Sequence, residues 1–182
     1  MKSRLTLLIL ILGLSFKSFA QEDAIQRFFS KYMEDERFSR VYISPKMMQM
    51  AGGFLKSNAG SDKDAEELGS LITKIRGIRI LSSEHVEGNV LYKEVMATLT
   101  KNSYEDLMDV QDATSNLKFM VREEGGLVKE LLMVSGDKQG EFTLISMLGS
   151  FTYKDLNMLA EKTNIPGMEQ YNKGSKGPKG PK

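Results

Sequence analysis

The chain has no cysteine, no tryptophan, one histidine and four prolines among its 182 residues. Without cysteine, the protein cannot form disulfide bonds, thiolate metal sites, a thiol nucleophile or a lipoprotein anchor at an N-terminal cysteine. A single histidine argues against most enzyme classes that depend on histidine for acid–base chemistry. Stability must therefore come from buried apolar side chains, and a body of about 150 residues is long enough for that.

Charge is distributed unevenly along the chain. The 25 basic and 24 acidic residues nearly cancel, but residues 21–172 hold 18 basic and 24 acidic side chains, a net charge of −6. This acidic body argues against nucleic acid as the main partner. The apolar and charged fractions, 41% and 27%, are ordinary for a globular protein, so we expect a single domain over residues 21–172.

The first 20 residues have the pattern of a secretory signal peptide. Two basic residues precede an apolar run from Leu5 to Leu14, and the small residues Ser18 and Ala20 stand at the −3 and −1 positions of a cleavage site. The apolar run is shorter than the roughly 20 residues that a membrane-spanning helix needs. We therefore expect cleavage between Ala20 and Gln21, and a periplasmic or secreted protein whose mature chain has no transmembrane segment. An uncleaved anchor helix is the alternative.

The last ten residues, 173–182, hold four lysines among glycine, serine and proline, with no apolar side chain. We expect this Lys/Gly/Pro tail to be disordered because it has nothing to bury. Its lysines either keep the chain soluble or make weak contacts with anionic surfaces.

Apolar residues recur at helical spacing in four segments. Ser44 and Pro45 form an N-cap followed by proline at the first helical position, and Ser61 or Asp62 can cap the next helix. The motifs Ser103–Asp106 and Thr152–Asp155 resemble capping boxes and predict two further helices. The four main segments cover residues 22–38, 45–55, 62–75 and 86–100.

Strand patterns dominate the second half of the chain. Apolar and polar residues alternate from residue 117, and Gly125-Gly126 allows a tight turn into a returning strand. The predicted strands cover residues 77–82, 117–122, 127–134 and 141–148, and the last is apolar on both sides, as a central strand is. We predict an α+β two-layer sandwich, a mostly antiparallel sheet of four or five strands with helices packed mainly on the Leu117/Phe119/Val121 face.

The order of several motifs resembles a known family. After the signal peptide come Ser44–Leu55, Gly77–Ser82, Tyr104–Met108, Gly125-Gly126 and Leu144–Gly149. This order is similar to an uncharacterised exported Bacteroidetes family, domain-of-unknown-function family 4252, over roughly residues 24–163. The resemblance implies an exported small α+β domain. It carries over no catalytic or binding residue, because the family has no established activity, and a link to cell-envelope regulation is an analogy only.

Glu130 is a polar intruder on a predicted apolar face. A hairpin loop of two or four residues would place it on the same side of the sheet as Phe119, Val121 and Leu132. A deeply buried carboxylate must pair with a cation or stay protonated, whereas one at the rim reaches water. The sequence leaves both positions open.

The opposite side of that hairpin mixes basic residues with methionine and leucine. Such a face either binds a partner or an acidic ligand, or simply covers its apolar area with basic side-chain stems. The candidate interaction surface consists of Lys118, Met120, Arg122, Lys129, Leu131 and Met133.

Other candidate chemistry is limited. His85 lies beside Ser83 and Glu84, but no Gly-x-Ser-x-Gly elbow is present, so we interpret it as an exposed loop residue. The acidic residues at 62–67 are explained by the first turn of a helix rather than by a calcium site, and those at 106, 109 and 112 are interpreted as a solvated helix face. No phosphate loop or dinucleotide fingerprint occurs. We therefore predict no catalytic residue, no metal and no cofactor.

The methionines at 47, 48 and 50 could suggest a copper(I) site, because soft thioethers bind that ion. Three positions so close in sequence cannot all face one way on a helix, so we expect core packing with one or two of them exposed.

The sequence thus predicts a non-enzymatic exported interaction or regulatory module whose partner is an unknown envelope protein. The alternative is a small-ligand-binding protein or enzyme with a pocket assembled from distant residues. A closed pocket above about 300 Å³ with converging polar groups would favour the alternative. A contiguous exposed apolar patch would favour the interaction module.

Overall fold

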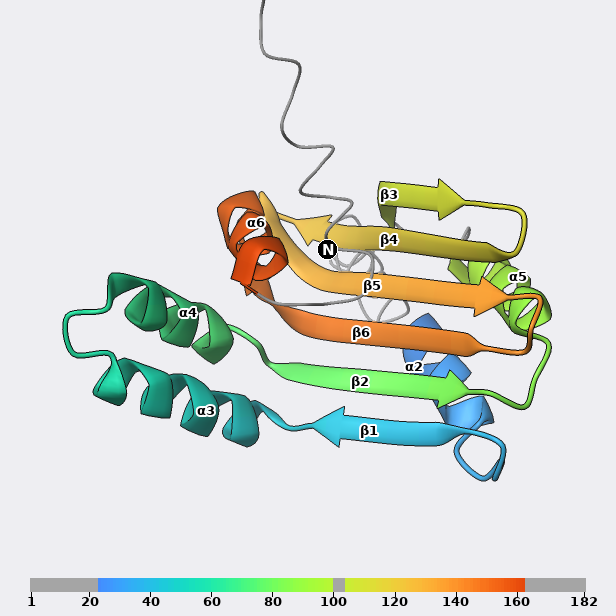
Figure 1. Cartoon of the computed structure of the whole chain (residues 1–182), viewed down its shortest axis with the longest axis horizontal. Helices are drawn as coiled ribbons and strands as arrows, with labels where there is room; N and C mark the ends of the chain where they lie inside the picture. The colour runs from blue at the N-terminus through green and yellow to red at the C-terminus, as the bar shows by residue number, and fades with distance from the viewer. Residues whose placement is uncertain (1–22, 100–103, 163–182) are drawn as a thin grey trace, which may run out of the picture.

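The computed structural model describes residues 23–99 and 104–162, which form five helices and one six-stranded antiparallel open sheet (Figure 1). The predicted α+β class is confirmed, and the sheet has more strands than the four or five expected. The predicted signal peptide and the Lys/Gly/Pro tail lie outside the described residues.

Neighbouring strands are antiparallel throughout the sheet, in the order β1-β2-β6-β5-β4-β3. β6 lies between β2 and β5, which explains why it is apolar on both sides. The strands are β1 (Ser39–Ile43), β2 (Gly77–Ser83), β3 (Glu105–Gln111), β4 (Ser115–Glu124), β5 (Leu127–Asp137) and β6 (Phe142–Phe151).

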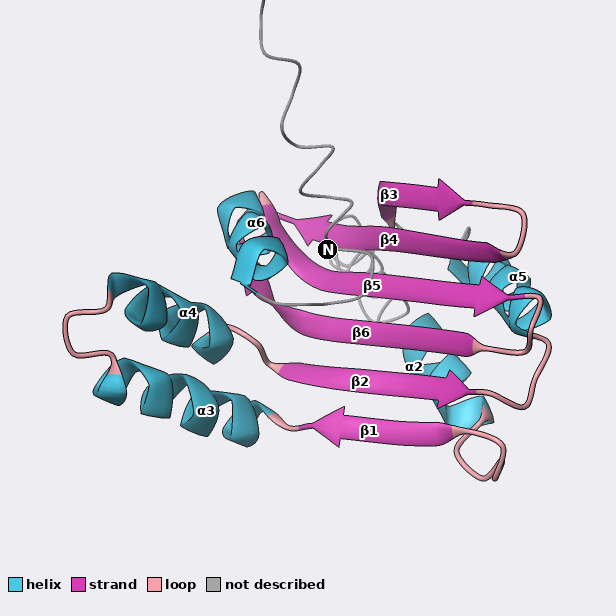
Figure 2. Cartoon of the chain, viewed as in Figure 1, coloured by secondary structure: helices cyan, strands magenta, loops and turns pink. Residues whose placement is uncertain are grey.

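Helices lie on both faces of the sheet rather than mainly on one. In Figure 2, α2 (Asp23–Lys31) and α5 (Gly88–Leu99) lie behind the sheet, and α6 (Tyr153–Lys162) lies in front of it. α3 (Pro45–Asn58) and α4 (Lys63–Thr73) form a hairpin beyond one end of the sheet.

Two hydrophobic cores result, one on each face. On the α5 face, Val95 belongs to the same buried cluster as Leu132 and Leu144. On the α6 face, Leu156 belongs to the same buried cluster as Phe119. Each of these side chains is almost fully buried, and burying one contributes about 1.5–3 kcal/mol. The two cores hold the central strands in place from both sides.

The predicted starts of two helices are confirmed. The Ser44 hydroxyl accepts a hydrogen bond from the Met47 N–H at 3.3 Å, with proline next in the chain. The Asp62 carboxylate caps α4 by accepting hydrogen bonds from the N–H groups of Asp64 and Ala65. These local contacts satisfy N–H groups that a helix cannot pair internally.

Two elements differ from the sequence prediction. The helix expected over residues 22–38 ends at Lys31, and the edge strand β1 follows it. The expected helix after Ser103 is wrong, because Glu105–Gln111 pairs with β4 as a strand. The acidic residues of β3 suit its position at the edge of the sheet, since charge on an edge strand discourages pairing with another chain.

A bulge in the β4–β5 hairpin changes which residues share a face. Arg122 pairs with Glu130, whereas the next pair is Glu123 with Val128, so one residue of β5 has no partner. An extra residue reverses the alternation of side chains on the bulged strand. The side of the sheet predicted for Glu130 is therefore wrong: it shares a face with Arg122, not with Val121.

Asp155 connects the start of α6 to the end of α4. Its carboxylate accepts a hydrogen bond from the Thr152 N–H at 2.8 Å and pairs with Lys74 Nζ at 2.8 Å. The Asp155 N–H donates in return to the Thr152 hydroxyl, which completes the predicted capping box. Burial alone would raise the pKa of Asp155, but the hydrogen bonds from Lys74 and Thr152 outweigh it, so this pKa lies below its ordinary value.

We expect Asp155→Asn to lower the free energy of unfolding by about 1–2 kcal/mol at pH 7. A carboxyl whose pKa falls on folding stabilises the native state above its unfolded-state pKa, near about 3.9, and this stabilisation is lost as the pH falls through the folded-state pKa. Wild type and variant should therefore converge in stability at low pH. Urea denaturation from pH 7 down to about pH 2.5 measures this, and a constant difference would contradict it.

Candidate functional site

Glu130 lies buried at the centre of a polar cluster on the α5 face of the sheet. Its side chain is 5% exposed, and Oε2 lies 3.3 Å from Arg122 Nη2. Oε2 also accepts a hydrogen bond from the Tyr104 hydroxyl at 2.7 Å, and Oε1 accepts one from the Ser146 hydroxyl at 2.6 Å. Of the two positions that the sequence left open, the structure shows the buried one, paired with a cation.

Tyr104 and Arg122 of this cluster keep their ordinary protonation states. The pKa of Tyr104 is raised well above its usual range, first by burial and then by the charge of Glu130. Burial opposes the charge on Arg122, but its interactions with Tyr104 and Glu130 raise its pKa overall. A neutral phenol and a charged guanidinium are therefore maintained at neutral pH, so the cluster is a buried ion pair that supports the fold.

The six residues of the candidate interaction surface do not form one surface. Met120, Leu131 and Met133 are buried, the first in the core beneath α5 and the other two in the core beneath α6. Arg122 is held by Glu130. The prediction of a single exposed face is therefore wrong. Because of the bulge in β5, Leu131 and Met133 lie on one side of the sheet and Met120 lies on the other.

The two lysines of that set also have partners within the chain. Lys118 Nζ lies 2.8 Å from an Asp106 oxygen and 2.9 Å from an Asp109 oxygen, and Lys129 Nζ donates to the Ser150 hydroxyl at 3.2 Å. A bulge in β3 lets both carboxylates reach Lys118, so they share a strand face rather than a helix face. The hydrogen bond with Asp106 is the main cause of the raised pKa of Lys118.

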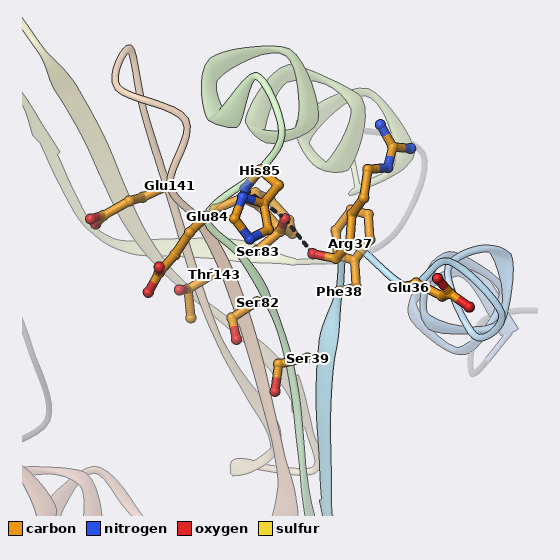
Figure 3. Close-up of a pocket in the computed structure, with 11 residues that line it drawn as sticks. Glu36, Arg37, Phe38, Ser39, Ser82, Ser83, Glu84, His85, Glu141 and Thr143 are labelled. Carbon is orange, nitrogen blue, oxygen red and sulfur yellow. Dashed lines mark hydrogen bonds between the residues drawn. The ribbon is translucent and has the colours of Figure 1, made fainter.

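A polar hollow of about 500 Å³ lies where β1 and β6 begin and β2 ends (Figure 3). The Ser83 hydroxyl donates to the Arg37 carbonyl at 2.6 Å and accepts from the His85 N–H at 3.1 Å. The Arg37 guanidinium is paired with Asp35 at 2.6 Å. Ser83 is thus engaged with backbone groups and is not held against the imidazole as a nucleophile against its base. The hollow is lined by residues 36–39, 82–85 and 141–143.

Within residues 23–99 and 104–162, neither a cluster of metal-ligating side chains nor a membrane-spanning helix is found. No group of three or more His, Asp or Glu side chains there could hold a metal ion. No helix within residues 23–99 and 104–162 is long and apolar enough to cross a membrane.

Exposed apolar side chains concentrate along one edge of the molecule. Eight large hydrophobic residues are exposed within the described residues, and six of them lie between residues 33 and 54. Figure 1 shows β1 leading directly into α3 along this edge. We call the six residues the apolar edge: Met33, Val41, Tyr42, Met47, Met50 and Phe54.

α3 presents a continuous apolar stripe to solvent. Met47, Met50 and Phe54 follow one another at helical spacing and are 57%, 60% and 68% exposed. The other side of α3 packs on α4, and a Cβ atom at Gly52 would lie only 2.5 Å from the Gly69 carbonyl oxygen. Because the two backbones touch, the stripe has little freedom to turn inward.

Part of the apolar edge was evident in the sequence. Met48 is buried while Met47 and Met50 are exposed, which confirms the expectation of core packing with one or two methionines outside. Val41 and Tyr42 were missed because β1 itself was missed. Their only signal was a β-branched residue next to an aromatic one in the short run Ser39–Ile43.

Comparison with known proteins identifies a family. Residues 32–159 match the family described as "Domain of unknown function (DUF4252)", and this range spans well over half of the chain. No curated protein and no solved structure gives a significant match. The matched range includes β1 and α3, and thus most of the apolar edge, as well as all of the sheet. The chain therefore belongs to the DUF4252 family.

Proposed function

We propose that this protein is a non-enzymatic interaction module of the cell envelope and that its partner docks on the apolar edge. The observation that carries the proposal is the clustering of six of the eight exposed large hydrophobic residues between residues 33 and 54. Exposed apolar side chains that gather along one edge mark a candidate interaction site, whereas isolated exposed residues such as Val90 and Tyr153 are normal.

The stripe on α3 is suited to docking in a hydrophobic groove. Helices that bind in this way present anchors at spacings of three, four and seven residues, as Met47, Met50 and Phe54 do. Fully burying one such side chain contributes about 1.5–3 kcal/mol. The glycine contact between α3 and α4 holds the stripe in place before binding, which reduces the entropy lost on association.

We also propose that the protein is exported and that its signal peptide is removed between Ala20 and Gln21. The support is the sequence pattern of a basic start, a short apolar run and small residues before the cleavage site. Sequencing the N-terminus of the secreted protein would identify the cleavage position.

The alternative function, small-ligand binding or an enzyme, has its best location in the polar hollow beside His85. Its volume of about 500 Å³ is large enough for a small molecule. The geometry gives it less support, because Ser83 and Arg37 are engaged elsewhere and His85 is exposed. Binding at the hollow would respond to His85→Ala and not to changes on α3.

Introducing charge on α3 should abolish docking. We expect the double variant Met50→Lys/Phe54→Lys to weaken partner binding about a hundredfold or more, because two buried apolar contacts are replaced by charges that must stay solvated. The partner is first isolated by tagged purification from the envelope of producing cells, and its affinity for each purified variant is then measured by calorimetry.

The matched control is Val90→Lys/Tyr153→Lys, which changes two exposed apolar residues outside the apolar edge. This variant should bind the partner as wild type does, and both variants should unfold at the same urea concentration as wild type. Equal binding by the α3 variant and wild type would contradict the proposed docking surface.

A further inference from the structure

A second feature of the same edge indicates the chemistry of the partner. A groove of about 500 Å³ lies between α2 and the outer strands of the sheet. In the β1–β2 register Tyr42 is opposite Arg79, and Arg40 is two residues before Tyr42, so all three side chains face the α2 side. Diagonal neighbours of this kind are about 7–8 Å apart, so Arg40 and Arg79 start from neighbouring positions on one side of the sheet, next to Tyr42.

In the described part of the chain, the positive charges of the two arginines in this groove are not neutralised by a nearby carboxylate. Within residues 23–99 and 104–162, neither the Arg40 nor the Arg79 guanidinium group has a hydrogen-bond or ion-pair partner, and no carboxylate lines the groove. By contrast, Arg37, Lys118 and Arg122 each have a carboxylate partner. In a body with 24 acidic and 18 basic residues, two adjacent cations without an acid form a local positive site.

The groove is bordered by an unprotected strand edge. β1 is the first strand of the sheet and pairs only with β2, so half of its backbone hydrogen-bonding groups face outward. β3, at the other edge, contains a bulge and three acidic residues, which hinder pairing. β1 has a regular register, no proline and no acidic residue. Of the two edges, β1 is therefore the one able to accept another strand.

We propose that the groove binds an extended acidic segment of the partner protein, which adds to β1 as a further strand and places carboxylates against Arg40 and Arg79. This inference rests on the proposed function, because it assigns the same edge to a partner. Alternate side chains of an added strand face the same side, so acidic residues at every second position would meet both guanidinium groups.

A second copy of this chain fits the edge less well. Antiparallel pairing of β1 with itself would bring Arg40 and Arg79 of both copies together on one face, with no carboxylate in the groove to separate them. Like charges on neighbouring strands are destabilising. An acidic strand removes that repulsion and satisfies the guanidinium groups at the same time.

The test uses fluorescent nine-residue peptides of alternating Glu and Thr, with matched Gln–Thr and Lys–Thr peptides as controls. Fluorescence anisotropy at low salt should show binding of the Glu peptide only. Arg40→Gln and Arg79→Gln should each weaken it about tenfold, since each removes one charged hydrogen-bond partner. Arg76→Gln changes an exposed arginine that does not line the groove and should leave binding unchanged.

Two further measurements make the result specific. Hydrogen exchange should slow at the outward N–H groups of β1 when the Glu peptide binds, because strand addition pairs them. The double charge reversal Arg40→Glu/Arg79→Glu should transfer binding from the Glu peptide to the Lys peptide. Equal binding of Glu and Gln peptides, binding without protection of β1, or arginine-dependent binding to anionic lipid vesicles but not to the peptide would overturn the proposal.

Failure of this inference can be distinguished from failure of the proposed function. In one outcome, the isolated partner binds wild type, binds Met50→Lys/Phe54→Lys more weakly, and binds Arg40→Gln and Arg79→Gln as tightly as wild type. Docking on the apolar edge would then be supported, and the proposed acidic segment would be wrong. If the Glu peptide binds as described while the α3 variant binds the partner normally, the groove stands and the docking role of α3 is wrong.

Discussion

Arg122→Met is expected to lower the free energy of unfolding by about 3–5 kcal/mol at pH 7. The substitution leaves the Glu130 carboxylate buried with only the hydroxyl groups of Tyr104 and Ser146 as partners. Hydrogen bonds from neutral donors do not offset the free energy lost when a carboxylate is removed from water. Removing one partner of a buried ion pair therefore destabilises a protein by more than the intact pair stabilises it. Urea denaturation followed by circular dichroism measures the change.

Replacing both members of the pair should restore most of the lost stability. In Arg122→Met/Glu130→Leu no charge remains buried, and apolar side chains of similar volume fill the space. The Arg122 Nε–H is buried without a hydrogen-bond partner in the described part of the chain, so the native pair is incompletely satisfied. We therefore expect the double variant to be at least 2 kcal/mol more stable than Arg122→Met, on the order of the penalty for a stranded charge.

Lys118→Met supplies the comparison for this ion pair. The Asp106 and Asp109 side chains are 57% and 51% exposed, so they keep their hydration when the lysine is lost. The cost should be no more than about 1 kcal/mol, as for ion pairs whose carboxylates remain in contact with water. If Arg122→Met proved no more damaging than Lys118→Met, Glu130 would not be a buried charge that needs its partner.

Gly88→Ala is expected to destabilise the protein by about 1–3 kcal/mol or more, because it overpacks a contact between backbones. A Cβ atom at Gly88 would lie 1.9 Å from the Glu141 carbonyl oxygen and 2.8 Å from the Asp137 backbone nitrogen. Asp137 ends β5 and Glu141 immediately precedes β6, so the start of α5 would have to move away from the sheet. Thermal and urea denaturation would record the loss.

Gly53→Ala is the matched control for that substitution. Gly53 lies in α3, and a Cβ atom there would meet nothing within 4 Å apart from its chain neighbours and the backbone of its own helix. Alanine favours a helix over glycine by up to about 1 kcal/mol, so this variant should be as stable as wild type or more stable. Equal losses for the two variants would show that the contact at Gly88 is not the cause.

Local signals in the sequence were sufficient for most of the fold. Helix caps at Ser44, Asp62 and Thr152 are short-range interactions, and their residue types identify them without any tertiary contact. β1 was not predicted because it is only five residues long and exposed at nearly every position. Such a strand shows no alternation of apolar and polar residues. β3 was misread because its acidic residues and preceding serine resemble the start of a helix.

The candidate site depends on tertiary arrangement to a greater extent. A bulge of one residue in β5 moved Glu130 to the other face, and no sequence pattern indicates where a bulge occurs. The exposed methionines of α3 were anticipated, but their place along the same edge as Tyr42 could be seen only once β1 was known to exist and to lead into α3. The unpaired state of Arg79 is likewise visible only when the surrounding residues are placed.

The most direct test of the interaction module is photo-crosslinking in producing cells with a photoreactive phenylalanine analogue at single positions. At Phe54 and Met50 the analogue should capture one and the same protein, while at Tyr153, an exposed aromatic residue away from the apolar edge, it should capture none. The account would be contradicted if Phe54 and Met50 gave no crosslinked product while an analogue at Tyr153 or beside His85 captured a defined partner.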